Sequence, residues 1–330
     1  MTSTAGTSRA AIRIGTRRSV LATTQAAHVA ARIAELLGRE TELVEIVTDG
    51  DVSQATGRPL AGSSATGVFV GALREALIGG HVDVAVHSLK DLPTQPADGI
   101  VLAAVPPRED PRDAVVARDG LTLGELPPGS RVGTGSPRRA AQLHALGLGV
   151  EVLGVRGNVD TRIGMVHSGE LDAVILARAG LARLGRLAEV TEVLDPLQML
   201  PAPGQGALAV ECRRGDDLVA ELAGLDDFST RAAVEAERSV LATLEGGCSA
   251  PIGALADVVE GDAGDELWIR AVALSLDGSL AVRRSASGDV SDAIGVGRRL
   301  GEEMLTDGAH ELDPAPPPTP VPHRQHQHHP

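Results

Sequence analysis

The chain has 330 residues and is poor in aromatic residues, cysteine and lysine. Its aromatic side chains are Phe69, Phe228 and Trp268, which leaves almost no stacking surface for single-stranded nucleic acid or flat ring cofactors. The two cysteines, Cys212 and Cys248, are too few for a disulfide framework, and the first ten residues hold no apolar stretch typical of an export signal. No apolar run approaches the ~18 residues of a membrane span. These absences predict a cytoplasmic protein that binds neither nucleic acid nor membranes.

The charge balance is acidic, with 44 aspartates and glutamates against 30 basic residues and a net charge of −14. Such a chain repels a phosphate backbone unless its basic residues gather on one face. Lys90 is the only lysine, so all other basic residues are arginines. Chemistry that needs a lysine amine, such as a pyridoxal Schiff base, has Lys90 as its single candidate, and a pyridoxal enzyme is one alternative to test.

The length exceeds the roughly 250–300 residues at which a single hydrophobic core stops growing, so two or three domains are expected. From residue 11 to about 200, short β-branched runs alternate with amphipathic helical stretches, which is typical of α/β units. The proline-broken segment 106–113 is a predicted hinge, and the strand at 207–212 is expected to return to the first lobe because a lone short strand needs a sheet to join. The predicted division is lobe 1 at 10–106 and 207–224, lobe 2 at 112–200, a small α+β domain at 229–312 and a disordered tail at 313–330.

Local signals place the first helix and the first candidate site. Ser19 is a predicted N-cap of a helix that reaches Leu37 and ends at Gly38. The strand at 82–87 carries Ser88, Lys90 and Asp91 to its C-terminal end, where ligands bind in open α/β sheets. Asp91 beside a cation could act as a general acid, although a plain loop ion pair with Lys90 is the alternative.

The segment GTGSPRR at 133–139 predicts a helix start with Ser136 as N-cap, Pro137 at the first position, and Arg138 and Arg139 in the first turn. Helix N-termini favour anions, so two guanidiniums there create a repulsion that an anionic ligand would relieve. The alternative is that both arginines are solvated surface residues.

Further arginines fall near the ends of predicted strands. They are Arg13, Arg17, Arg156, Arg162 and Arg183. Guanidiniums bind carboxylates in bidentate fashion, so their convergence would suit a ligand with many carboxylates. A chance scatter in an arginine-rich chain, or a non-enzymatic anion-binding protein with two hinged lobes, remains an alternative.

The two cysteines have different surroundings. Cys248 lies in LEGGCSAP, where glycines could present its thiol on an exposed loop as a nucleophile. Cys212 ends an apolar strand and is expected to be buried and inert.

Taken in order, eight segments resemble the porphobilinogen deaminase, or hydroxymethylbilane synthase, family. They are RIGTRRS, VDVAVHSLKDLP, REDPRDA, GTGSPRR, RGNVDTR, LDAVILARAGLARLG, LPAPGQGALAVE and AERSVLATLEGGCSAPIG. The resemblance implies two lobes of the periplasmic-binding-protein type, followed by a domain that carries the cofactor cysteine. It implies a cytoplasmic monomer that joins four porphobilinogen molecules, with loss of ammonia, into hydroxymethylbilane for tetrapyrrole biosynthesis.

The same resemblance assigns roles to individual residues. It implies that Cys248 holds a dipyrromethane cofactor through a thioether, that Asp91 is the catalytic carboxylate, and that no metal is needed. The implied cofactor contacts are Ser88, Lys90, Thr134, Ser136, Arg138, Arg139, Arg162 and Arg183. The implied substrate contacts are Arg13, Arg17 and Arg156. The chain departs from the family at Thr66 and Gly71, where lysines are frequent, and at Asp49, where a basic or neutral residue is common.

Overall fold

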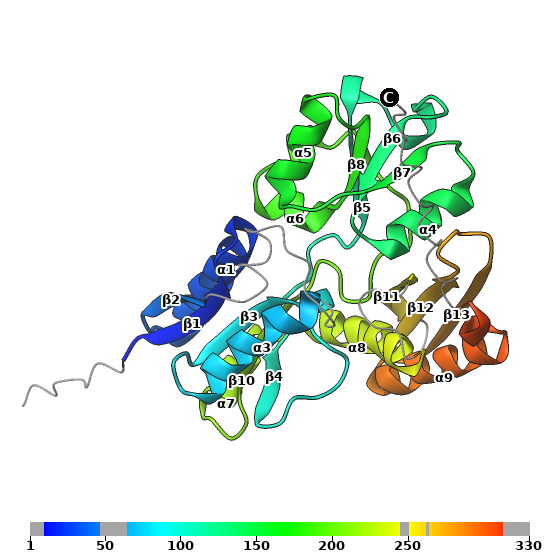
Figure 1. Cartoon of the computed structure of the whole chain (residues 1–330). Coiled ribbons are helices and arrows are strands. Elements are labelled where there is room, and N and C mark those ends of the chain that lie inside the picture. Colours follow the sequence, from blue (N-terminus) through cyan, green and yellow to red (C-terminus); the bar gives the residue numbers. More distant parts are fainter. Residues whose placement is uncertain (1–9, 47–64, 245–250, 262–263, 313–330) are drawn as a thin grey trace, which may run out of the picture.

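In the computed structural model, residues 10–46, 65–244, 251–261 and 264–312 are described, with backbone only for 65–69. The strands within these ranges form two five-stranded sheets and one three-stranded sheet. Figure 1 shows lobe 1 in blue and cyan, lobe 2 in green above it, and the C-terminal domain in yellow and orange beside both. The predicted tail at 313–330 and Asp49 lie outside the described residues.

Lobe 1 is a mixed sheet with strand order β2-β1-β3-β10-β4, covered by helices on both faces. Its elements are β1 (Ile12–Arg17), α1 (Val20–Leu37), β2 (Thr41–Ile46), α3 (Ala65–Ile78), β3 (Val84–Ser88), β4 (Ile100–Ala104), β10 (Leu208–Arg213) and α7 (Leu218–Glu221). Val84 and Val86 pack in the core under α1, whereas Ala85 packs with Leu73 and Leu77 of α3. Because this part of the strand is buried on both faces, residues 84–86 are all apolar, as expected for a buried strand.

Lobe 2 repeats this plan with the order β7-β6-β8-β5-β9. Its elements are β5 (Asp113–Ala117), β6 (Arg131–Thr134), α4 (Pro137–Leu146), β7 (Glu151–Gly154), α5 (Val159–His167), β8 (Ala173–Ala177), α6 (Arg178–Arg183) and β9 (Glu192–Val193). In each lobe the fourth strand of this order, β10 or β5, is antiparallel to its third. Each of these strands follows directly on a crossing from the other lobe, so the predicted return of the strand at 207–212 to lobe 1 is confirmed.

The C-terminal domain packs two helices against one face of an antiparallel sheet. Its elements are α8 (Phe228–Thr243), β11 (Ile252–Gly261), β12 (Gly264–Leu274), β13 (Ala281–Asp289) and α9 (Ala293–Thr306). Along β12, Leu267, Ile269 and Ala271 point into the helical core. The predicted α+β class of this domain is confirmed.

Two segments cross between the lobes: the first, 105–112, joins β4 to β5, and the second, 194–207, joins β9 to β10. One buried carboxylate connects both crossing segments to the C-terminal domain. Glu237 of α8 is fully buried and accepts hydrogen bonds from Arg108 of the first crossing segment, at 2.7 and 3.0 Å. It also accepts from the backbone N–H of Gly204 in the second crossing segment, at 2.6 Å, and of Ala256 in β11, at 2.9 Å. The two crossing segments are thus fixed to a common point on α8.

The sequence predicted most element bounds closely. α1 begins after Ser19, whose hydroxyl accepts from the N–H of Ala22, and ends at Gly38 with φ of 60°. The apolar run at 68–78 predicts a helix after a Gly/Ser-rich loop at 57–67. In the structure this helix begins earlier, at Ala65, so the predicted loop is too long at its C-terminal end. No helix among the described residues is long and apolar enough to cross a bilayer.

Candidate active site

A cleft between the two lobes collects most of the predicted site residues. The C-terminal ends of β1 and β3 in lobe 1 face α6 and the loop after β7 in lobe 2. Two adjoining cavities of about 120 and 230 Å³ there have Arg17, Lys90 and Gly180 in common. The predicted residues that line them are Arg17, Ser88, Lys90, Asp91, Arg139, Arg162 and Arg183.

A single 3₁₀ turn presents Asp91 and Lys90 to this cleft. β3 ends at Ser88, and the turn that follows spans Leu89–Asp91. Leu89 is fully buried, and its N–H donates to the carbonyl of Ala207 in the second crossing segment at 3.0 Å. The buried leucine anchors the turn, so the half-buried Asp91 is held at the cavity wall.

Lys90 does not form the loop ion pair that was the alternative for it. Its Nζ donates to Oε1 of Gln205 at 3.4 Å, rather than pairing with the neighbouring Asp91. Burial lowers the pKa of Lys90 to about 8, although the carboxylates of Asp91 and Asp113 act in the opposite direction. Lys90 is therefore a cation that gives up its proton more easily than an exposed lysine.

Arg138 and Arg139 are not solvated, and the protein itself supplies the anion that compensates them. Both side chains are buried, and the fully buried Asp113 accepts from Arg138 Nη2 at 2.8 Å and from Arg139 Nη2 at 2.8 Å. Although burial favours the neutral acid, the two guanidiniums hold the pKa of Asp113 far below its ordinary value. The expectation that a ligand would be needed to relieve the repulsion is thus wrong.

The two arginines differ in their relation to the cleft. Arg139 lines it, with its Nη1 donating to the carbonyl of Ile175 at 3.0 Å. Arg138 donates instead to the carbonyl of Leu200 at 2.5 Å and lines neither cavity. Its Nε is buried and has no hydrogen-bond partner among the described residues.

Arg162 and Arg183 face the cleft with carbonyl partners. Arg162 Nε donates to the carbonyl of Gly157 at 3.0 Å, and Arg183 Nη2 to that of Gly206 at 2.6 Å. Burial lowers the pKa of both, and the neighbouring Arg139 lowers that of Arg162 further. Because a carbonyl bears no net charge, these desolvated cations suit a ligand that brings carboxylates.

Besides Arg138, four predicted contacts lie outside the cavity walls. Arg13 lies near the N-terminal end of β1, about 13 Å along the strand from Arg17. There its Nε and Nη2 donate to the carboxylate of Asp83 at 3.1 and 2.8 Å. Arg156 is exposed in the loop after β7. Thr134 is buried, and its Oγ1 accepts from the N–H of Ser136 at 3.2 Å. Ser136 is the N-cap of α4 as predicted, but its side chain makes no capping hydrogen bond.

Sequence reasoning missed Asp113 and Gln205. Gln205 Nε2 donates to Asp113 Oδ1 at 2.8 Å and to the carbonyl of Pro111 at 2.7 Å, while its Oε1 accepts from Lys90. The two side chains thereby link the arginines of lobe 2 to the lysine of lobe 1. The motifs REDPRDA and LPAPGQG contained both residues, but nothing local marked them as partners.

Of the two cysteines, the structure describes only Cys212. Cys248 lies outside the described residues, in the segment between α8 and β11. Cys212 is buried in β10, and burial raises the pKa of its thiol to about 12, so the predicted inert cysteine is confirmed. No cluster of metal-ligating side chains occurs in the part of the chain that the structure describes.

Comparisons with known proteins agree along nearly the whole chain. A family model described as the dipyromethane cofactor binding domain of porphobilinogen deaminase matches residues 12–221, and one for the C-terminal domain of that enzyme matches residues 231–306. The chain is 61% identical over 308 residues to the porphobilinogen deaminase of Mycobacterium tuberculosis H37Rv, covering 91% of this chain and 98% of the relative. The chain belongs to the porphobilinogen deaminase family. The enzyme of Nocardia farcinica is 55% identical over 91% of this chain and 87% of its own length.

The chain is also distantly similar to solved structures of other proteins. One is a putative methionine-binding lipoprotein of Bacillus subtilis, with TM-score 0.39 and 14% identity over 65% of this chain and 89% of that one. Another is the periplasmic VFT2 domain of Bordetella pertussis BvgS, with TM-score 0.38 and 16% identity over 64% and 85%. These likenesses are too distant to carry over any ligand.

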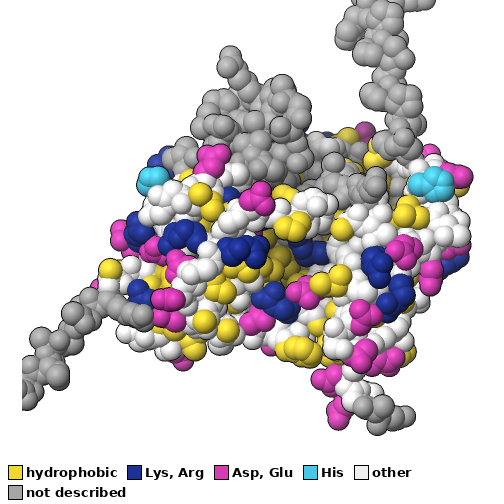
Figure 2. Space-filling model, turned by 90° about the horizontal axis from the view of Figure 1, so that it is seen from below, with side chains coloured by type: hydrophobic (Ala, Val, Ile, Leu, Met, Phe, Trp, Pro, Cys, Tyr) yellow, Lys and Arg dark blue, Asp and Glu magenta, His cyan; other side chains and the backbone are white. Residues whose placement is uncertain are grey.

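The cleft of this deaminase chain fits the dipyrromethane of its family. The cofactor carries carboxylates, and the walls offer the desolvated guanidiniums of Arg162 and Arg183, which are held only by backbone carbonyls. On the face seen from below, basic side chains lie among acidic ones (Figure 2). The cleft is thus a local basic site in an acidic protein.

Proposed function

We propose that the residues of the interlobe cleft divide the deaminase reaction among them, with Asp91 as the acid and the arginines as the carboxylate sites. By its family the chain is a transferase of tetrapyrrole biosynthesis that condenses four porphobilinogen molecules into hydroxymethylbilane on a dipyrromethane primer. The observation that carries the proposal is that one cleft holds Asp91 and Lys90 together with four arginines.

Asp91 would stabilise positive charge on the substrate ring. When the substrate loses ammonia, its pyrrole nitrogen becomes electron-poor, and a fixed carboxylate next to it lowers the energy of that state. The 3₁₀ turn anchored by Leu89 fixes this carboxylate before the charge develops. Asp91 can also deliver or accept the proton that the leaving amine and the new ring junction require.

The cations of the cleft would hold the carboxylates of the pyrrole rings. Each ring brings an acetate and a propionate, so several guanidiniums are needed at once. Arg17, Lys90 and Arg183 line the cavity that contains Asp91, while Arg139 and Arg162 line the neighbouring one. We assign Arg17 to the incoming substrate, and Arg139 and Arg162 to the primer, as the resemblance implied. Lys90 and Arg183 were implied as primer contacts, but they share the cavity of Asp91, so we assign them to the incoming substrate instead.

We assign the attachment of the dipyrromethane to Cys248. When bound, the cofactor supplies the free pyrrole α-carbon to which each new ring is joined. The assignment is supported by the inert state of the other cysteine, because the pKa of buried Cys212 is raised to about 12 and its thiolate is not accessible.

Intact mass spectrometry tests this assignment. The full chain should be heavier than its sequence by two pyrrole units, and Cys248→Ala should lose the added mass. Cys212→Ala is the matched control and should keep it. An unmodified mass from an active preparation, or an adduct that persists in Cys248→Ala, would refute the assignment.

The role of Asp91 is tested by Asp91→Asn, with Asp98→Asn as control. Asp98 is exposed in the same segment of lobe 1. We expect kcat to fall by about 10²-fold or more for Asp91→Asn, the range of a lost acid catalyst, and to be unchanged for Asp98→Asn. Normal turnover by Asp91→Asn would exclude the role.

We further propose that the enzyme acts as a monomer in the cytoplasm. The proposal follows from the resemblance of the eight ordered segments to the family, which implied a cytoplasmic monomer. Light scattering on the purified protein tests the monomer, and a dimer mass at micromolar concentration would refute it. Fractionation of the native host tests the compartment.

A further inference from the structure

A larger hollow lies outside the catalytic cleft, on the outer face of the C-terminal sheet. Its volume is about 600 Å³, within the range of small-molecule sites. Strands β11, β12 and β13 form its floor, and the loop of Pro196 and Leu197 in lobe 2 overhangs it. None of its lining residues lines either cavity of the cleft.

The alternation of β12 decides which side chains reach this hollow. Residues of even number near its middle point outward, so Trp268 and Arg270 face the cavity. Strand pairing sets Asp257 and Ser287 on either side of Trp268, and Ser285 beside Arg270. The floor is thus an aromatic ring surrounded by polar groups.

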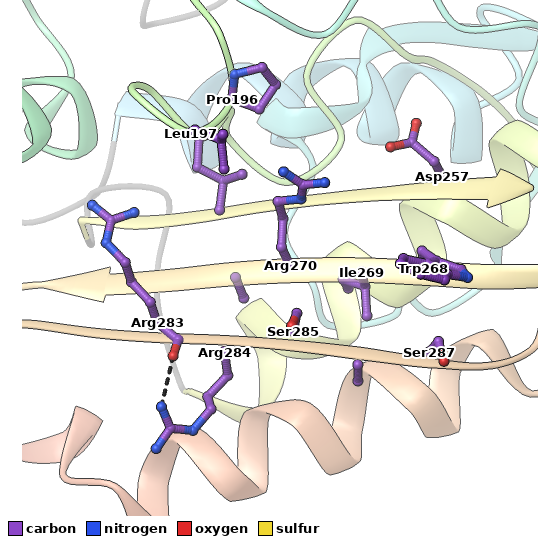
Figure 3. A pocket seen from close by; sticks show the side chains of 13 residues that line it. Pro196, Leu197, Asp257, Trp268, Ile269, Arg270, Arg283, Arg284, Ser285 and Ser287 are labelled. Carbon is purple, nitrogen blue, oxygen red and sulfur yellow. Dashed lines mark hydrogen bonds between the residues drawn. The ribbon is translucent and has the colours of Figure 1, made fainter.

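Two guanidiniums in the hollow have no acidic partner within the described parts of the chain. They belong to Arg270 and Arg283, and Figure 3 shows both directed toward the overhanging loop. Arg284 points the other way, and its Nε binds Asp307 at 2.7 Å. The two guanidiniums outnumber the one carboxylate that lines the hollow, that of Asp257, and this leaves a local excess of positive charge.

Trp268 supplies the apolar part of the hollow. It is the only tryptophan of the chain, and 56% of it is exposed. Its Nε1 donates to Oε2 of Glu266 at 3.0 Å, which fixes the indole while leaving ring surface uncovered. An exposed, fixed indole beside unpaired arginines is the composition of a recognition site rather than of an ordinary solvated sheet face.

We propose that this hollow is a second ligand site, which binds a planar ring carrying carboxylates. The ring lies against Trp268, the carboxylates pair with Arg270 and Arg283, and Asp257 accepts a ring N–H. The site requires no covalent step and does not include any residue of the cleft. Carboxylated pyrroles have this chemistry, and both the substrate and the linear product of the family contain them.

Tryptophan fluorescence measures binding at this site directly, because the chain has a single tryptophan and no tyrosine. The probe is pyrrole-3,4-dicarboxylate, which lacks the aminomethyl leaving group and cannot be turned over. We expect a saturable change in the emission of the full-length holoenzyme, with a Kd of about 1 mM or below. Pyrrole and succinate supply the ring and the carboxylates separately and should bind at least about tenfold more weakly.

Variants of the two arginines test the location. Arg270→Gln and Arg283→Gln should each weaken probe binding by about tenfold, the effect of one lost charge-assisted hydrogen bond. Arg298→Gln, an exposed arginine of α9 outside the hollow, is the matched control. Porphobilinogen turnover by Arg270→Gln should stay within about twofold of the parent chain. Absence of a saturable response, equal weakening by Arg298→Gln, or binding of succinate as tight as that of the probe would overturn the proposal.

Two further titrations determine whether the natural ligand of this site is the substrate or the product. In the first, porphobilinogen is mixed rapidly with the holoenzyme, and the tryptophan emission is recorded before turnover. In the second, the linear tetrapyrrole is added immediately after its release from the enzyme, and the same emission is recorded. A response to the monomer assigns the site to substrate, and a response to the tetrapyrrole alone assigns it to product. If neither changes the emission, the proposal fails. The choice of source rests on the proposed function, whose own test is the mass of the Cys248 adduct, so the two failures are distinguishable.

Discussion

At the scale of single residues, Asp113 is the centre of the site's electrostatics. It accepts hydrogen bonds from both arginines of α4 and from Gln205, all within the protein interior. Charged hydrogen bonds of this kind stabilise the fold only while every partner is present. The basic cleft therefore depends on an acid that lines neither of its cavities.

Asp113→Asn should lower the free energy of unfolding by about 3 kcal/mol or more, because two buried guanidiniums would lose their counter-charge. Urea unfolding measures the change, and Asp119→Asn, an exposed carboxylate paired with Arg118, should stay within about 0.5 kcal/mol. The folded-state pKa of Asp113 lies below the unfolded value, so its contribution is complete above the ordinary pKa of 3.8 and is lost as the pH falls below it. Equal losses in the two variants would contradict this role.

Lys90 gives the site a pH dependence of its own. With a folded-state pKa of about 8 against an ordinary 10.5, it loses its charge while an unfolded chain would still hold the proton. Fold stability therefore rises between these two pH values, because the unfolded state binds the extra proton. The affinity of the cleft for carboxylates, which depends on the ammonium of Lys90, falls as the pH rises over the same range.

We expect kcat/KM for porphobilinogen to decline as the pH rises through about 8, by about tenfold once Lys90 is neutral. Lys90→Arg keeps its charge at every accessible pH, so this part of the profile should flatten. A decline of the same size in Lys90→Arg would assign it to another group.

The sequence indicated the position of a side chain in the fold where the signal was local, and did not where the position depended on distant segments. Arg13 and Arg17 lie near opposite ends of the same strand, β1, and sequence spacing alone did not show that only Arg17 is at the end that faces the cleft. The buried state of Arg138 could not be read locally, because its partner Asp113 is 25 residues away. Lys90 and Asp91 were found because the end of a buried strand is a general location of ligands.

At the scale of elements, bounds were predicted best where capping residues mark them. Ser19 and Gly38 fixed both ends of α1, since the hydroxyl satisfies a free N–H and glycine adopts the left-handed turn. The helix α3 carries no comparable marker near Ala65, and there the prediction erred. Prolines in the sequence marked the crossing segments, but nothing in the sequence indicated that both segments bind Glu237 of α8.

Glu237→Gln should destabilise the protein by about 3 kcal/mol, because it leaves the guanidinium of Arg108 buried without a carboxylate at the junction of both crossings. Glu235 of the same helix is half-buried and pairs with Arg231, so Glu235→Gln is the matched control, with an expected loss of under about 1 kcal/mol. Thermal or urea unfolding measures the loss of stability in the two variants. A loss from Glu237→Gln no larger than that of the control would show that the junction is not stabilising.

At the scale of the whole molecule, the two crossing segments are joined to each other. Arg108 Nε donates to the carbonyl of Gln205 at 2.8 Å, and the N–H of Glu109 to that of Gly206 at 3.3 Å. Gly206 has φ of 89°, and a Cβ there would collide with the carbonyl oxygen of Glu109. The lobes are therefore connected by a bonded pair of segments that passes beside the cleft.

Gly206→Ala should cost more stability than Gly215→Ala. Both glycines have positive φ, but a Cβ on Gly215 meets only open space, so that variant reports backbone strain alone, about 1 kcal/mol. The extra cost at Gly206, about 1–3 kcal/mol, comes from forcing the crossing segments apart. Equal unfolding free energies for the two variants would show that the segments separate freely.

The placement of β10 also orders the assembly of the protein during its synthesis. Lobe 2 takes every strand of its sheet from residues 113–193, whereas lobe 1 must wait for residues 208–213 to fill the gap between β3 and β4. A nascent chain emerging from the ribosome can therefore close its second lobe while the first still has two unpaired strand edges. Those edges are where premature pairing with another chain would begin, so the interval before residue 213 emerges is when the protein most needs chaperone protection.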